Sequence, residues 1–288
     1  MPPLNSKDKL FQKKSTLNCR GNILSLRTPQ VMGILNLTPD SFYPNSRLTS
    51  TAEAVKRAEA MLADGADILD IGGYSSRPGA ADVSEQEELD RVIPAIEAIH
   101  AAFPEAIISI DTFRAGVAEG AINAGAAIVN DISGGSLDEE MFRTVAKLQV
   151  PYILMHMRGT PQTMATLTKY NDLVIDVLDE LQEQLAKLAK LGVKDIILDP
   201  GFGFAKTTDQ NFELLRRMDE FRILGLPVLA GMSRKSMVYK SLDIEQTDAL
   251  TGTIVVNTIA LMKGADILRV HDVKETKQTI QLYTKTLL

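Results

Sequence analysis

Three polar residues, Asp111, Asn130 and Asp199, each stand at the end of a short apolar run. An ionised carboxylate accepts two parallel N–H bonds, and a carboxamide donates and accepts at once. If the three side chains converge, they suit a flat heterocycle that offers neighbouring N–H donors and ring-nitrogen acceptors. A structural polar layer and a site for a hard cation are the alternatives that these residue types leave open.

Basic groups form a second set toward the C-terminus. Ser233–Ser236 reads Ser-Arg-Lys-Ser, and Arg269 and His271 flank the end of a later apolar run. The formal net charge of the chain is −6, so these cations cluster in an otherwise acidic protein. We expect them to bind an anion such as a phosphate, with a solvated Arg–Lys pair as the alternative. His271 is the best candidate among the three histidines.

Asn36 ends the first apolar run and begins a third group. The segments Thr38–Arg47 and Tyr74–Ser84, which follow the first two runs, are rich in small polar residues and proline, as mobile lids are. The amide oxygen of Asn36 suits Mg²⁺ only if substrate phosphates complete the coordination shell. His156 follows the fifth run and reads equally well as a site residue or a packed one. With three histidines and the single cysteine Cys19, a zinc site is not expected.

The elements that must position these groups alternate eight times between a short apolar run and a helical pattern. Runs this short, rich in Ile, Val and Leu, are typical of parallel strands covered on both faces. Eight such units predict an α/β fold, a (β/α)8 TIM barrel, with the polar groups at the carboxyl ends of its strands. The expected strands are Val31–Leu37, Ile68–Gly72, Ile107–Ile110, Ala127–Val129, Tyr152–Met155, Ile196–Leu198, Val228–Ala230 and Ile267–Val270; the clearest helices are Ala52–Ala63, Glu85–Ala101, Ala115–Ala124, Leu173–Leu191, Phe212–Leu224 and Ala249–Met262.

The domain organisation expected is one barrel, residues 31–288, preceded by an N-terminal extension, residues 1–30. The extension begins as a polar leader, and Leu17–Leu26 contains the turn residues of a short hairpin. Such a hairpin suits the closure of one end of the barrel. No change of composition marks a linker within residues 31–288.

The overall composition, 45% hydrophobic and 24% charged, is that of an ordinary globular protein. An acidic chain has no general attraction for nucleic acid or for anionic membranes, and we expect neither as a partner. No apolar run approaches the ~18 residues of a membrane span. The single cysteine, Cys19, and the absence of a signal-like segment favour the reducing cytoplasm.

The sequence motifs at the expected strand ends also resemble those of a known family, dihydropteroate synthase. This is the folate-pathway enzyme that sulfonamides block. The resemblance runs in order from about Val31 to the C-terminus. It rests on Met-Gly-Ile-Leu-Asn-Leu-Thr-Pro-Asp-Ser-Phe at 32–42, Asp-Ile-Gly-Gly-Tyr-Ser-Ser-Arg-Pro-Gly-Ala at 70–80, Ser-Ile-Asp-Thr at 109–112, Val-Asn-Asp-Ile at 129–132, Leu-Met-His-Met at 154–157, Leu-Asp-Pro-Gly-Phe-Gly-Phe at 198–204, Gly-Met-Ser-Arg-Lys-Ser at 231–236 and Arg-Val-His-Asp at 269–272.

The resemblance implies a transferase that condenses 6-hydroxymethyl-7,8-dihydropterin pyrophosphate with 4-aminobenzoate, giving 7,8-dihydropteroate and pyrophosphate. It also implies a homodimer, with the apolar face of Thr253–Met262 as one candidate contact, and sulfonamides as inhibitors. Carried over by position, the pterin residues are Asp111, Asn130, Asp199 and Lys235; the aminobenzoate residues are Ser76, Arg77, Pro78, Phe204 and Ser236; the pyrophosphate residues are Asn36, Arg269 and His271, with Mg²⁺ at Asn36; and the catalytic residues are Asp111, Lys235, Arg269 and His271.

The implied chemistry is a cation-like loss of pyrophosphate. Asp111 would stabilise the positive charge left on the pterin, and the amine would attack without a strong base. Tyr74, Ser76 and Ala205 stand where many members of the family carry Glu, Thr and Gly, which affects the expected fit of aminobenzoate and sulfonamides. A methyltetrahydrofolate-binding methyltransferase barrel and a catalytically silent pterin-binding paralogue are the alternatives. The cationic residues argue against the first, and the complete loops after the first two strands argue weakly against the second.

Overall fold

The computed structural model describes residues 13–37, 47–74 and 83–287. Eight of its strands form one parallel sheet, in the order β8-β7-β6-β5-β4-β3-β10-β9. The strands are short and almost wholly buried because helices cover their outer face and packed side chains fill the inner one. They are β3 (Gln30–Asn36), β4 (Ile68–Gly72), β5 (Ile107–Asp111), β6 (Ile128–Asp131), β7 (Tyr152–Met155), β8 (Ile196–Asp199), β9 (Leu229–Ala230) and β10 (Ile267–Val270).

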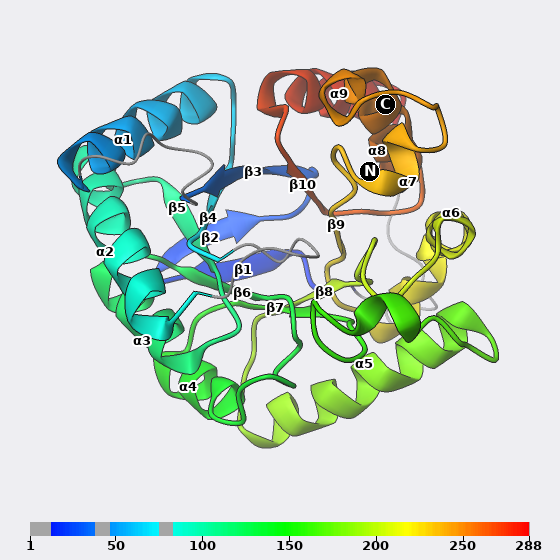
Figure 1. Ribbon diagram of the computed structural model, residues 1–288, viewed down its shortest axis with the longest axis horizontal. Coiled ribbons are helices and arrows are strands. Elements are labelled where there is room, and N and C mark those ends of the chain that lie inside the picture. The colour runs from blue at the N-terminus through cyan, green and yellow to red at the C-terminus, as the bar shows by residue number, and fades with distance from the viewer. Residues whose placement is uncertain (1–12, 38–46, 75–82, 288) are drawn as a thin grey trace, which may run out of the picture.

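The sheet closes on itself between β8 and β9. A parallel bridge joins Leu198 to Val228, and the amide of Leu198 donates to the carbonyl oxygen of Pro227 at 2.8 Å. The helices form a ring outside the closed sheet, as Figure 1 shows, so the predicted (β/α)8 barrel is confirmed. They are α1 (Arg47–Ala63), α2 (Glu85–Ala102), α3 (Ala115–Ala124), α4 (Met141–Leu148), α5 (Leu173–Lys190), α6 (Thr208–Arg216), α7 (Ser236–Tyr239), α8 (Leu250–Met262) and α9 (Val273–Lys285).

Local sequence signals explain where several helices begin and end. Ser84 and Glu87 form a reciprocal capping box at the start of α2, and the Asp172 carboxylate caps α5 by accepting from the amides of Val174 and Ile175. Gly125 ends α3 at a φ of 128°, a left-handed conformation that a Cβ atom would oppose. These caps fix the lengths of the connections that return the chain to the next strand.

One predicted helix is divided in the structure. The pattern of Phe212–Leu224 predicted a single helix, whereas α6 ends at Arg216 and a 3-10 helix, η4 (Met218–Leu224), follows it. The capping box of Thr207 and Gln210 starts α6 earlier than the pattern indicated. The tighter 3-10 helix repeats every three residues, and it places Met218 and Phe221 together in the core.

The N-terminal hairpin closes the end of the barrel at which the strands begin, as expected. It consists of β1 (Thr16–Cys19) and β2 (Asn22–Ser25), which pair antiparallel. Leu17, Cys19 and Leu26 are buried in one cluster with residues from the first halves of the barrel strands, among them Met32, Ile68, Ile128, Ile153, Ile197, Leu229 and Ile267. The hairpin therefore seals the bottom of the barrel and leaves the opposite end for the loops that carry the polar groups.

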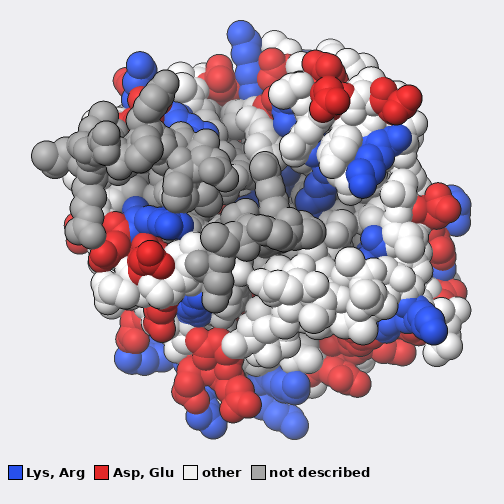
Figure 2. Space-filling view, in the orientation of Figure 1, with Lys and Arg blue, Asp and Glu red and all other residues white. Residues whose placement is uncertain are grey.

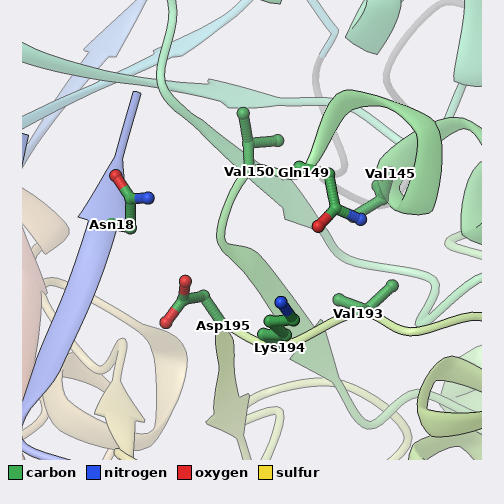
Figure 3. Close-up of a pocket in the computed structure, with 7 residues that line it drawn as sticks. All are labelled: Asn18, Val145, Gln149, Val150, Val193, Lys194 and Asp195. Carbon is green, nitrogen blue, oxygen red and sulfur yellow. The ribbon is translucent and has the colours of Figure 1, made fainter. Parts of the chain in front are cut away.

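A small hollow lies at this bottom end, where Asn18 of β1 faces the segment before β8 (Figure 3). Its volume is about 120 Å³, well below the ~300 Å³ at which small-molecule sites begin. Lys14 already pairs with Asp195 there at 2.6 Å. The hollow lies at the end of the barrel opposite the candidate site residues, and its size excludes a bicyclic ligand. Its lining is Asn18, Val145, Gln149, Val150, Val193, Lys194 and Asp195.

None of the helices that the structure describes combines the length and the apolar character needed to cross a membrane.

Candidate active site

Strand register brings the expected polar residues to one level of the barrel. Asn36 of β3 is opposite Gly72 of β4, Gly72 is opposite Asp111 of β5, and Asp111 is opposite Asn130 of β6. On the next strands, Met155 of β7 is opposite Asp199 of β8. Residues that are far apart in the chain therefore share the carboxyl rim of the sheet.

Arg269 of β10 bridges two carboxylates at the centre of this rim. Its Nε atom lies 2.6 Å from Oδ2 of Asp70, and its Nη2 atom lies 2.5 Å from Oδ2 of Asp111. Asp70 also accepts from Nδ2 of Asn130, at 3.1 Å to Oδ2. Asp70 is fully buried, whereas the side chains of Asp111 and Arg269 are each 19% exposed. The bridge thus has an interior end and an end that faces the mouth.

The charges of this bridge are unevenly balanced. Burial would lower the pKa of Arg269, but the neighbouring carboxylates of Asp70 and Asp111 raise it, so the guanidinium stays charged. Burial raises the pKa of Asp111 to about 7, although the Arg269 charge opposes that rise. The single guanidinium of Arg269 thus pairs with two carboxylates, those of Asp70 and Asp111. When Asp111 is ionised, this part of the mouth carries an excess of negative charge, which favours a ligand that becomes positive.

Asp199 and Lys235 form the opposite side of the mouth. Oδ1 of Asp199 accepts from the amide of Gly201 at 2.8 Å, and burial raises the pKa of its carboxyl. Lys235 donates from Nζ to the carbonyl oxygen of Phe202, and this nitrogen lies 4.8 Å from the centre of the Phe204 ring. Burial lowers the pKa of Lys235 to about 8, against the effect of Asp199. An acceptor, a donor and an aromatic face stand together here.

His271 is held in one orientation by Ser233. The hydroxyl of Ser233 accepts from the backbone N–H of His271 at 3.1 Å and lies 3.0 Å from Nδ1 of the ring. If the hydroxyl donates its proton to Nδ1, the ring proton is on Nε2. Arg234, in contrast, makes two hydrogen bonds to the carboxylate of Asp272, at 2.9 and 2.7 Å. Of the two basic residues in Ser233–Ser236, Lys235 therefore lies at the mouth, whereas Arg234 forms an ion pair with Asp272.

Apolar residues line part of the same end of the barrel. Phe204 and Met155 are buried in a cluster separate from the main core, with residues from the loops after β5, β6, β7 and β8. Figure 2 shows this face of the molecule, with blue basic atoms inside a central hollow and red acidic atoms around the periphery. An apolar wall beside paired polar groups suits a planar, hydrogen-bonding ligand. The cluster comprises Ile132, Met155, Met157, Met164, Phe204 and Ala205, with Phe113 and Leu137 against it.

The remaining expected site residues divide into two sets. The half-buried Asn36 ends β3 at the rim, and Ser236 is the exposed first residue of α7. Ser76, Arg77 and Pro78 lie outside the described residues. The residues expected to bind the pterin and the pyrophosphate thus gather at one mouth, whereas the set expected to bind aminobenzoate is described only at Phe204 and Ser236.

Two residues that sequence reasoning did not select are central to this region. Asp70 pairs with Arg269 from within β4, and its signal was a carboxylate inside the otherwise apolar run Ile68–Gly72. Lys206 is buried, and its Nζ atom lies 2.9 Å from Nδ1 of His156. No local signal distinguishes Lys206 from a solvated lysine. His156 itself packs in the interior and does not face the mouth network.

Comparison with known proteins agrees with this geometry. A family model described as pterin binding enzyme matches residues 32–271. Dihydropteroate synthase of Escherichia coli (strain K12) is 45% identical over 274 residues, which cover 94% of this chain and 96% of that protein. The chain belongs to the dihydropteroate synthase family of pterin-binding enzymes. The resemblance found in the strand-end motifs is thereby confirmed.

Solved structures of dihydropteroate synthases share the whole barrel. The Xanthomonas albilineans enzyme with 4-aminobenzoic acid has a TM-score of 0.88 at 38% identity, covering 95% of this chain and 98% of that chain. The Yersinia pestis enzyme in a sulfonamide drug complex has a TM-score of 0.88 at 41% identity, covering 94% and 98% of the two chains. The hairpin, the barrel and its rim are therefore arranged as in the dihydropteroate synthase family.

Proposed function

We propose that the mouth of this barrel condenses 6-hydroxymethyl-7,8-dihydropterin pyrophosphate with 4-aminobenzoate to give 7,8-dihydropteroate and pyrophosphate, a step of folate biosynthesis. The observation that carries the proposal is the bridge from Arg269 to Asp70 and Asp111, which places one cation and two carboxylates beside Asn130. Solved structures of related dihydropteroate synthases with 4-aminobenzoic acid, with a sulfonamide drug and with 7,8-dihydropteroate support the same substrates and inhibitors.

The pterin is bound by the acceptors and the amide at the rim. Asp199 accepts from the 2-amino group and the N3–H of the pyrimidine ring, and Asn130 faces the same edge. Lys235 reaches the O4 and N5 side; its Nζ donates to the carbonyl oxygen of Phe202 and lies 4.8 Å from the centre of the Phe204 ring. Paired donors and acceptors of this kind fix a flat ring in one orientation.

Loss of pyrophosphate is the step that the charged groups assist. The bond between the methylene carbon and the diphosphate oxygen breaks, and both electrons leave with the oxygen. Asp111 stabilises the positive charge that spreads over the dihydropterin, while Arg269 and the Nε2–H of His271 stabilise the departing diphosphate. Preorganised groups of this type are each worth roughly 3–4 kcal/mol in the transition state.

The residues of the site suit Mg²⁺ only when the substrate supplies part of its coordination shell. The Asn36 amide makes no hydrogen bond to another described residue, and its oxygen and the Asp111 carboxylate both lie close to Gly72. Among the described residues no cluster of three His, Cys, Asp or Glu side chains forms a metal site by itself. Asn36 would hold the ion, with diphosphate oxygens and water as the other ligands, and Mg²⁺ would supply charge neutralisation at the leaving group.

The second substrate completes the reaction without a strong base. The lone pair of the aminobenzoate nitrogen forms the new C–N bond, and the resulting ammonium loses a proton to solvent. Phe204 and Ser236, with Ser76, Arg77 and Pro78, would line this part of the site. No step needs an activated nucleophile of the protein, since the cation formed in the first step is itself reactive.

The direct test supplies purified protein with the pterin pyrophosphate, 4-aminobenzoate and Mg²⁺. The expected result is equal release of pyrophosphate and 7,8-dihydropteroate, inhibited by a sulfonamide that competes with 4-aminobenzoate. Binding of the pterin without release of pyrophosphate would instead identify a silent pterin-binding protein and refute the proposal.

We also propose that the protein works as a cytoplasmic homodimer. Helix α8 presents exposed apolar side chains, with Val255 54%, Ile259 37% and Met262 68% exposed. Exposed apolar side chains that cluster on one helix suit contact with a second copy. Light scattering should give twice the monomer mass for the wild type and the monomer mass for a Val255→Asp, Met262→Glu variant; a monomeric wild type would refute the dimer.

A further inference from the structure

The loop from β8 to α6 begins directly after Asp199 and carries Phe204, yet it has little regular structure to hold it. Gly201, Gly203 and Ala205 all have positive φ angles, of 73°, 81° and 50°. A Cβ atom at Gly201 would meet the carbonyl oxygen of His156 at 1.9 Å, so the loop passes very close to the end of β7. Something other than local backbone preference must keep this loop in place.

Lys206, at the end of the loop, supplies part of that restraint, beside Asn211, Lys235 and Tyr170. Its ammonium nitrogen lies 3.1 Å from the carbonyl oxygen of Gly201, 3.1 Å from that of Phe204 and 2.9 Å from Nδ1 of His156. An ammonium has three N–H donors, and here each has one acceptor. No carboxylate of the described residues lies within 4 Å of this nitrogen, so backbone dipoles and one imidazole solvate the charge.

His156 connects this lysine to the surface. Because the ammonium can only donate, Nδ1 of His156 must accept, and the ring proton resides on Nε2, which lies 3.0 Å from Oε2 of Glu180. Arg158 in turn binds Glu180 and lies 3.9 Å from the centre of the Tyr170 ring. Tyr170 donates its hydroxyl to the carbonyl oxygen of Ala205 at 3.0 Å. This series of contacts begins at Lys206 and therefore ends on the same β8–α6 loop, at Ala205.

We propose that Lys206 is a positioning residue of the pterin site: its ammonium fastens the loop that follows Asp199 and bears Phe204 to His156 at the end of β7. This proposal rests on the pterin-binding role proposed above for Asp199. Lys206 does not reach the mouth, and it acts through the turn at Gly201, whose amide donates to the Asp199 carboxylate at 2.8 Å.

The neutral state of His156 agrees with the geometry, whereas burial opposes the protonated state of Lys206. Burial, together with the Lys206 charge, lowers the pKa of His156 to about 4, so the ring is neutral at physiological pH. Burial also lowers the pKa of Lys206 to about 7, against the effect of Asp199. The three acceptors around Nζ require the protonated lysine, because a neutral amine has only two N–H donors.

The first experiment measures the dissociation constant of the pterin pyrophosphate by calorimetry. Lys206→Met keeps the side-chain length and removes the charge; we expect about tenfold weaker binding, the effect of losing a buried hydrogen-bonded anchor. Lys206→Arg should recover part of the affinity, because it keeps the charge but not the tetrahedral arrangement of donors. The matched control is Lys190→Met on the exposed end of α5, which should bind as the wild type does.

A second readout is specific to the contact with His156. The chain has only three histidines, so nitrogen-15 NMR of labelled imidazoles resolves each ring, and His156→Gln assigns the signal. The wild type should show a neutral His156 ring protonated at Nε2, and Lys206→Met should raise the midpoint of its titration by a pH unit or more. A purely structural lysine elsewhere in the fold would not move this signal.

The outcomes are distinct. Unchanged pterin binding in Lys206→Met, or a wild-type His156 ring protonated at Nδ1, would overturn the proposal while leaving the proposed function intact. If Lys206→Met does not fold, Lys206→Gln takes its place, and pterin affinity equal to wild type in that variant would overturn the proposal. A wild-type protein that does not bind the pterin would overturn the proposed function and this inference together.

Discussion

Arg269 of β10 and Asp70 of β4 lie 2.6 Å apart, Nε to Oδ2, although 199 positions separate them in the chain. The pair crosses the barrel interior just below the rim, and the same guanidinium reaches Asp111 at the mouth. A buried carboxylate therefore sets the position of the cation on which the proposed departure of pyrophosphate depends.

The Asp70→Asn variant tests how much the ion pair of Asp70 with Arg269 contributes to the stability of the fold. The substitution removes the fully buried carboxylate and leaves Asp111 as the remaining carboxylate partner of Arg269, and the free energy of unfolding should fall by about 3 kcal/mol. Urea denaturation measures the change, and Asp64→Asn on the exposed end of α1 serves as control, with an expected effect within ~0.5 kcal/mol. Equal stability of Asp70→Asn and the control would show that the bridge contributes nothing to folding.

Ser233→Ala tests the orientation of His271. Without the hydroxyl, the ring loses its partner at Nδ1, and Nε2–H is no longer directed at the diphosphate. Steady-state kinetics should show about a tenfold lower kcat/KM for the pterin pyrophosphate, the usual effect of losing one orienting hydrogen bond. Ser233→Thr keeps the hydroxyl and should recover most of the rate. Identical rates for the alanine variant and the wild type would exclude this role.

The acid stability of the protein should depend on His156. Its pKa is lowered to about 4 in the folded protein, from an ordinary value of 6.5, because burial opposes the charge. The unfolded state therefore binds more protons between pH 6.5 and 4, and stability falls as the pH falls through that window. The loss from this group between pH 6.5 and 4.5 should be roughly 2 kcal/mol.

Urea titrations at the two pH values measure that loss, and His156→Gln should reduce the difference while His100→Gln should not. Glu180 contributes little to this slope because both states keep it mostly ionised above pH 4.5. Burial alone would raise its folded pKa, but hydrogen bonds from His156 and Arg158 lower it from 4.5 to about 2. Asp111 titrates with the opposite sign in this window, so the comparison of the variant with the wild type isolates His156. An equal difference in stability between the two pH values for His156→Gln and for the wild type would contradict the neutral, buried state of His156.

The pH dependence of activity should reflect Asp111. Burial raises its pKa to about 7, and only the ionised form stabilises a cationic pterin. The value of kcat/KM should fall as the pH falls through about 7, and an Asp111→Asn variant should lose this dependence. The effect on folding has the opposite sign, because a raised acid pKa lowers stability as the pH rises from about 4 to about 7. A rate that does not change between pH 6 and 8 would contradict this assignment.

The strands were predictable because each has its own local signal. Tyr152–Met155 and Ile267–Val270 have the predicted bounds, since each is a short apolar run between polar or glycine residues. The end of Phe212–Leu224 was not predictable in the same way, because its 3-10 geometry depends on how Phe221 packs in the core.

The site was predictable only in part, for a related reason. Asp111, Asn130 and Asp199 lie at the carboxyl ends of their strands, and parallel strands bring such residues to one rim. Asp70 pairs with a residue at the far end of the chain, a contact that exists only once the barrel has closed. Local sequence also does not reveal that Arg234 forms an ion pair with Asp272 while Lys235 donates to the carbonyl oxygen of Phe202.

The most direct test of the central claim is the turnover number of Asp111→Asn, measured as pyrophosphate release with saturating pterin pyrophosphate, 4-aminobenzoate and Mg²⁺. The substitution keeps the shape of the side chain and removes its charge. The account predicts a fall in kcat of about 10²–10³-fold, the loss expected when a preorganised charge no longer faces the transition state. A kcat within about threefold of the wild type would contradict it.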